Sequence, residues 1–266
     1  GRQAISDHNF VTASKFQARS ISADPANFKL LEGLMISFIA QGSVDEAVSI
    51  AEVYKDTGSE SQISQMILLA SMIKDGQTEA FLNFVKNASE ITPILKDLLS
   101  AWIRMGLDDE VNANRIFDKT AKVQGMGQFA NFHRAMSQLA AGKIEQAQRT
   151  FDLIHSDQAN PTRRSVIYHT KILLSQSKFK EAQQLLEKWF GPTFDPEIEE
   201  LYVNAVTEQA YPKNLFPKIN LAVADVFHSI ANLISKEADP TFTLIYSRLA
   251  QYLDDTHVDS TLMTAE

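Results

Sequence analysis

Three groups of residues in this chain have side chains that can do chemistry: histidines, glutamates and a basic cluster. The histidines are scattered, and no two of them stand four residues apart: His8, His133, His155, His169, His228 and His257. Histidines that share a metal ion from one helix usually have that spacing. We therefore expect solvated or locally hydrogen-bonded imidazoles and no metal site.

The glutamates gather where paired carboxylates could serve as general acid and base: Glu197, Glu199, Glu200 and Glu208. Glu197 follows Pro196 at an expected helix start, where an acidic side chain interacts favourably with the helix dipole. The chain has no cysteine, and the sequence shows no nucleophile and base that would converge. We therefore expect a protein that is not an enzyme and binds no cofactor. A hydrolase in the C-terminal region is the alternative.

The densest basic cluster consists of Arg163, Arg164, Lys171, Lys178 and Lys180. It is consistent with a solvated helix face, and alternatively with a docking site for an acidic peptide or an anionic glycan end. The whole chain of 266 residues has a net charge of -8, which repels phosphates, so we expect no nucleic-acid partner.

Small residues recur along the chain and indicate which elements position these groups. They are separated by 33 to 35 residues: Ala13, Ala47, Ala80, Ala113, Ala147 and Ala182. The positions four residues later are mostly apolar: Gln17, Ala51, Phe84, Phe117, Phe151 and Leu186. A period near 34 predicts a stacked array of antiparallel helix pairs, because alanine fits where three helices approach closely.

The connections inside the pairs have their own signals. Gly42, Gly76, Gly106 and Gly142 precede the small residues, and glycine favours the left-handed turn that ends a helix. Ser43 and Glu46 have the spacing of a capping box at the next helix start.

After Trp189 the repeat pattern breaks, and two turn-rich connections cover residues 190–196 and 211–217. We expect helices over 198–210 and 218–236, another from Pro240, and a short one from Ser260. We therefore divide the chain into a repeat array, 1–189, and an irregular helical continuation of the same solenoid, 190–266. Because Gly1 stands in the middle of a repeat, we interpret the chain as a portion of a longer protein.

The glycine, alanine and phenylalanine pattern resembles the tetratricopeptide repeat (TPR) in degenerate form, with Leu31 and Leu95 in place of the family's early aromatic residue. Residues 223–231 and 244–253 resemble a subgroup of bacterial, often exported, TPR proteins of unassigned function. The resemblance implies an all-α, right-handed α-solenoid whose first helices line a concave peptide-binding surface. It favours the bacterial periplasm or envelope over the cytoplasm, although no targeting segment is present to identify the compartment.

The predicted peptide-binding stripe follows the outward face of the first helices. It consists of Lys29, Glu32, Ile36, Met66, Ala70, Lys96, Ser100, Phe132, Met136, Arg164 and Lys171. Its middle is apolar and adaptable and its end is cationic, which suits a segment with apolar anchors and a terminal carboxylate. We expect charge reversal at Arg164 and Lys171 to abolish binding without loss of stability. The alternative for Phe132 and Met136 is burial in the core.

These features predict a non-catalytic scaffold that binds a peptide or protein segment on its concave face. The alternative is a regulatory or substrate-presenting subunit of a bacterial envelope-assembly enzyme complex, with the chemistry on a partner. No apolar run reaches the roughly 18 residues needed to span a bilayer, so we expect no membrane insertion. Self-association stays open.

Overall fold

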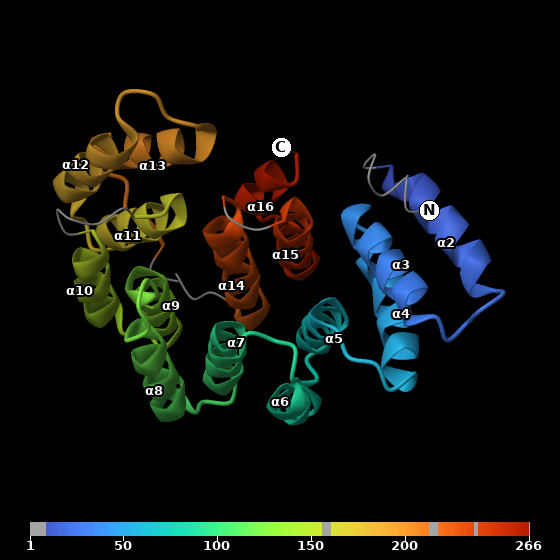
Figure 1. The fold of residues 1–266 in the computed structure, drawn as a ribbon. Coiled ribbons are helices and arrows are strands. Elements are labelled where there is room, and N and C mark those ends of the chain that lie inside the picture. The colour runs from blue at the N-terminus through green and yellow to red at the C-terminus, as the bar shows by residue number, and fades with distance from the viewer. Residues whose placement is uncertain (1–8, 156–160, 213–217, 237–238, 266) are drawn as a thin grey trace. The chain divides into compact units, whose positions relative to one another are not determined.

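The computed structural model describes residues 9–155, 161–212, 218–236 and 239–265, and these form fifteen α-helices and no strand (Figure 1). The predicted all-α class is confirmed, and the right-handed sense of the array stays a prediction. None of the described helices combines the length and the apolar character needed to cross a membrane. In the first part of the chain the helices are α2 (Phe10–Ile21), α3 (Phe28–Ala40), α4 (Val44–Asp56), α5 (Gln62–Lys74), α6 (Thr78–Asn87) and α7 (Pro93–Gly106).

The middle and the end of the chain continue in the same way. The middle helices are α8 (Glu110–Ala121), α9 (Gly127–Ala140), α10 (Ile144–Ile154), α11 (Arg163–Ser175), α12 (Phe179–Phe190) and α13 (Pro196–Val206). The last three are α14 (Ile219–Ile234), α15 (Pro240–Leu253) and α16 (Val258–Met263), close to where the sequence predicts them.

The chain forms two compact units. Unit 1 consists of residues 1–103 and 219–266, and unit 2 consists of residues 104–218. The predicted boundary at residue 189 therefore lies inside unit 2. The reason is tertiary: α15 packs against α3, α4 and α5, so the last helices belong with the first ones. In unit 2 each helix from α8 to α13 packs against the next, and α11 also packs against α13.

The small residues that recur along the chain are core residues in five of the six repeats. Those that are fully buried are Ala13, Ala47, Ala113, Ala147 and Ala182. In α6 the prediction is wrong, because Ala80 is exposed and Phe81 is fully buried. The buried face of this helix consists of Phe81, Val85 and the following Ala88, so its register is shifted by one residue.

The turns between helices confirm part of the predicted pattern. Gly42, Gly76 and Gly142 have φ values of 82°, 68° and 72°, in the left-handed region that glycine adopts without strain. Gly106, however, is the last residue of α7, and Asp108 has the left-handed φ of 57° in that connection. The predicted capping box at Ser43 is also absent, because its side chain makes no capping hydrogen bond.

Candidate functional site

The predicted peptide-binding stripe is only partly at the surface of unit 1. Lys29 is exposed, and Glu32, Ile36, Lys96 and Ser100 are half-buried. The two residues from α5 that should supply an adaptable apolar centre, Met66 and Ala70, are fully buried. Both are core residues in this structure, because a helix of the same chain packs on α5.

That helix is α15, and tyrosines hold it against the N-terminal helices. The Gln62 amide nitrogen donates to the Tyr246 hydroxyl at 3.3 Å, and the Tyr252 hydroxyl donates to Asp45 Oδ1 at 2.7 Å. The Lys74 ammonium lies 3.6 Å from the centre of the Tyr252 ring, a short cation–π contact. In unit 1 the surface of α3 and α5 therefore already has an occupant.

The environment of these tyrosines keeps their hydroxyls protonated. Burial raises the pKa of Tyr246 to about 12. Burial and the hydrogen bond to Asp45 raise the pKa of Tyr252 as well. Both hydroxyls therefore stay protonated over the ordinary pH range and act as hydrogen-bonding groups.

The apolar part of the stripe in unit 2 is also buried. Phe132 is 5% exposed and Met136 is 1% exposed. The Phe132 ring packs edge-on against Phe151, with their centroids 6.3 Å apart. Phe132 and Met136 are therefore core residues, which is the alternative interpretation of the sequence.

Two members of the basic cluster, Arg163 and Lys171, are paired with carboxylates around the start of α13. Arg163 makes a bidentate contact with Asp195, with Nε and Nη2 each 3.0 Å from a carboxylate oxygen, and Nη2 reaches Glu197 at 3.1 Å. Lys171 contacts the other oxygen of Glu197 at 3.2 Å. The Arg164 guanidinium lies 5.7 Å from the centre of the Tyr168 ring. Two groups that the sequence presents as separate candidates thus neutralise each other.

The pairing of Lys171 changes what a charge reversal should do. In Lys171→Glu a carboxylate would face Glu197, so we expect a loss of about 1 kcal/mol in the free energy of unfolding. This replaces the expectation of unchanged stability. Urea denaturation measures the loss, and Lys180→Glu, at an exposed position of α12, is the matched control. Equal effects of the two reversals would contradict a role for the Lys171–Glu197 pair.

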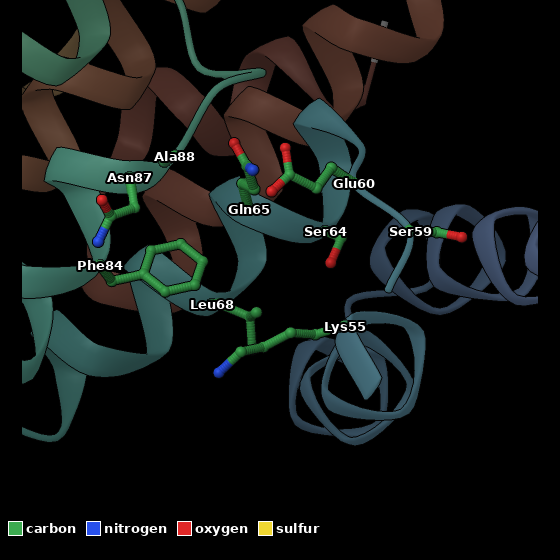
Figure 2. Close-up of a pocket in the computed structure, with 9 residues that line it drawn as sticks. All are labelled: Lys55, Ser59, Glu60, Ser64, Gln65, Leu68, Phe84, Asn87 and Ala88. Carbon is green, nitrogen blue, oxygen red and sulfur yellow. The ribbon is translucent and has the colours of Figure 1, made fainter. Parts of the chain in front are cut away.

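An open cavity in unit 1 lies between α4, α5 and α6 (Figure 2). It has a volume of about 270 Å³. Its lining consists of Lys55, Ser59, Glu60, Ser64, Gln65, Leu68, Phe84, Asn87 and Ala88. The register shift in α6 explains why Phe84 is available here: the residue four positions after the small one is fully buried in α8 and α10, whereas Phe84 is half-buried.

The polar groups around this cavity, called the α4–α6 pocket below, are partly committed to the protein. The Gln65 Oε1 accepts from the Glu90 amide at 3.0 Å, and Glu60 accepts a hydrogen bond from Ser89. The exposed Lys55 ammonium lies 5.8 Å from the centre of the Phe84 ring. The pocket therefore combines an apolar wall, an aromatic face and a cation at its rim.

Four of the five histidines that the structure describes lie in two pairs, His155 with His169 and His228 with His257, and His8 lies outside the described residues. In unit 1, His257 Nε2 lies 3.2 Å from Asp225 Oδ1, and His228 Nδ1 lies 3.1 Å from Ser260 Oγ. The His257 Nδ1 accepts from the Ser260 amide at 3.1 Å, so it is not placed to act as a base on the Ser260 hydroxyl. Ser260 is also fully buried, which leaves no approach for a substrate. This arrangement connects α14 and α16.

The second histidine pair, His155 with His169, lies in unit 2. Sequence spacing could not reveal either pair, because the partners are 14 and 29 residues apart. Within the described part of the chain, no three histidine or acidic side chains are grouped as metal ligands would be.

Comparison with known proteins gives no family assignment: no family model matches the chain, and no curated protein matches it. The resemblance to tetratricopeptide repeats therefore rests on the repeat pattern alone.

Proposed function

We propose that this chain is a non-catalytic scaffold that binds a peptide segment of a partner protein, and that the α4–α6 pocket receives one side chain of that segment. The observation that carries the proposal is the pocket itself, an open cavity in which Leu68, Phe84 and Ala88 form an apolar wall and the Lys55 ammonium lies at the rim. The proposed site is on α4, α5 and α6 rather than on the first-helix face, because α15 packs against two of the first helices, α3 and α5.

The size of the pocket supports a side chain rather than a cofactor. Sites for small molecules usually enclose about 300 to 1,000 Å³, and this cavity has about 270 Å³. Leu68, Phe84 and Ala88 supply apolar contact, and Lys55 supplies a positive charge. A fitting segment therefore presents an apolar side chain beside an aspartate or glutamate.

A random peptide library displayed on phage and selected on the full chain tests the proposal. We expect enrichment of peptides with an apolar residue next to an acidic one. The affinity of a selected peptide is then measured by fluorescence anisotropy. Phe84→Ala should weaken it about tenfold or more, equivalent to roughly 1.4 kcal/mol. Lys55→Glu should weaken it in a manner that depends on salt.

Lys86→Glu is the matched control, because Lys86 is an exposed lysine of the same helix, α6, that does not line the pocket. It should leave the affinity unchanged. Peptides that bind wild type and Phe84→Ala equally well would remove the pocket from the proposal. A selection that enriches no sequence would overturn the scaffold function itself.

A further inference from the structure

A continuous chain of polar contacts crosses from α10 to α11 in unit 2. Asp152 Oδ1 lies 3.3 Å from His169 Nε2, and His169 Nδ1 lies 2.8 Å from His155 Nδ1. The chain continues from His155 Nε2 to Ser165 Oγ at 3.1 Å, and from Ser165 Oγ to the Thr162 carbonyl at 2.7 Å. The residues at its two ends are exposed, Asp152 with 56% of its side chain and Thr162, whereas the side chains of His155, His169 and Ser165 between them are buried.

The surroundings of the two imidazoles are mostly aromatic. Phe151 stacks on both rings, with centroid distances of 6.0 Å to His155 and 5.7 Å to His169. From α9, Phe132 packs on Phe151, and from α12, Trp189 lies 6.4 Å from His155. The charged groups that act on the chain are Asp152 itself and two lysines associated with α12, Lys178 and Lys188.

The number of protons in this chain of polar contacts decides which of the contacts can be hydrogen bonds. Four contacts join Asp152, His169, His155, Ser165 and the Thr162 carbonyl. Two neutral imidazoles and one hydroxyl supply only three protons, since a neutral imidazole has one N–H. One contact therefore lacks a proton. The longest of the four contacts, 3.3 Å between Asp152 and His169 Nε2, is the one without a proton, because neutral His169 donates from Nδ1 and Ser165 donates to the Thr162 carbonyl at 2.7 Å.

One additional proton removes this deficit. With His169 charged, its Nε2–H donates to Asp152 and its Nδ1–H donates to His155 Nδ1. His155 then carries its proton on Nε2 and donates to Ser165, whose hydroxyl donates to the Thr162 carbonyl. All four contacts are filled, and the Asp152 carboxylate balances the new charge. A second proton, on His155, would place two N–H groups against each other at 2.8 Å.

We propose that Asp152, His169, His155 and Ser165 form a site for a single proton. One proton, on His169, completes the hydrogen bonds of the site, and a second proton breaks the contact between the two imidazoles. The site makes the connection between α10 and α11 sensitive to acid. The two protonation steps belong to the coupled pair rather than to either ring alone.

The electrostatics agree with this order of protonation. Burial first, and then the neighbouring His169, lower the pKa of His155 to about 3. The hydrogen bond from His169 lowers the pKa of Asp152. Unfolded histidine titrates near about 6.5, so the unfolded chain binds a proton that folded His155 refuses. His155 therefore makes unit 2 less stable as the pH falls from about 6.5 toward 3.

The full chain, labelled with ¹⁵N at histidine, allows a direct test by nuclear magnetic resonance. His155→Gln and His169→Gln variants assign the ring signals. We expect His155 to stay neutral while the pair takes its first proton. Throughout that step His155 should carry its proton on Nε2, which the ring nitrogen shifts report. A His155 with its proton on Nδ1, or two rings that take up protons together, would overturn the proposal.

A second test changes Asp152, which lies at one exposed end of the chain of polar contacts. Asp152→Asn removes the balancing carboxylate and should move the midpoint of the pair's first protonation to lower pH. Glu145→Gln, at an exposed position of the same helix, removes one negative charge outside the chain and should leave the midpoint in place. Equal shifts in the two variants would show that Asp152 has no specific role in holding the proton.

Discussion

Phe151→Ala should destabilise unit 2 by about 3 to 5 kcal/mol, because it truncates a large aromatic side chain in the core. Phe151 is fully buried, and its ring contacts Phe132 and the two paired histidines. Removing the ring leaves a cavity beside the buried contacts between His155 and His169, and Phe132 and the two imidazoles lose their packing. Thermal and urea denaturation of the variant measure the change in the free energy of unfolding.

Leu153→Ala provides the comparison within the same helix. Leu153 is 71% exposed and lies two residues from Phe151. Its truncation should change the free energy of unfolding by no more than about 0.5 kcal/mol. Similar losses for the two variants would mean that the buried face of α10 is assigned incorrectly.

Ala147→Leu is the second large effect, with an expected loss of about 1 to 3 kcal/mol. Ala147 is fully buried in α10, which packs against both α9 and α11. The added methyl groups have no space between these helices, so either the backbones move apart or the leucine adopts a strained rotamer. Denaturant unfolding at equilibrium measures the loss.

The same enlargement at the surface separates packing from helix propensity. Glu145→Leu places leucine at an exposed position of α10, where it should cost no more than about 0.5 kcal/mol. A neutral Ala147→Leu would contradict the repeat register in this part of the chain, because the register is what requires a small residue there.

The register of a helix could be predicted where one apolar face dominates, and the prediction failed where two possible apolar faces compete. In α10 and α12 the residues at the small position and one turn later are all buried. In α6, Ala80 and Phe84 fit the repeat period, but Phe81, Val85 and Ala88 fit the helix period equally well. That second pattern could be read in the sequence. Packing selected it, and the same choice left Phe84 at the α4–α6 pocket.

The candidate sites depended on contacts between distant residues, so little of them could be predicted. The basic cluster around Arg163 and the carboxylates around Glu197 were each visible, and their separation of 34 residues equals the repeat period, yet they were treated as separate groups. The pairing of His155 with His169, 14 residues apart, leaves no such trace in the sequence. Local pattern identifies which side chains are unusual, and only proximity shows whether they bind a partner or each other.

The sequence by itself determined the helical class, the approximate positions of the last four helices and five of the six small core positions. These depend on interactions within a few residues or on a repeated volume constraint, both of which leave a periodic trace. Only the tertiary structure decided that α15 returns to cover α3 and α5, that Met66 is buried and that the histidines meet. Such contacts join segments far apart in the chain, and their free energy comes from shape and polar pairing that no local periodicity records.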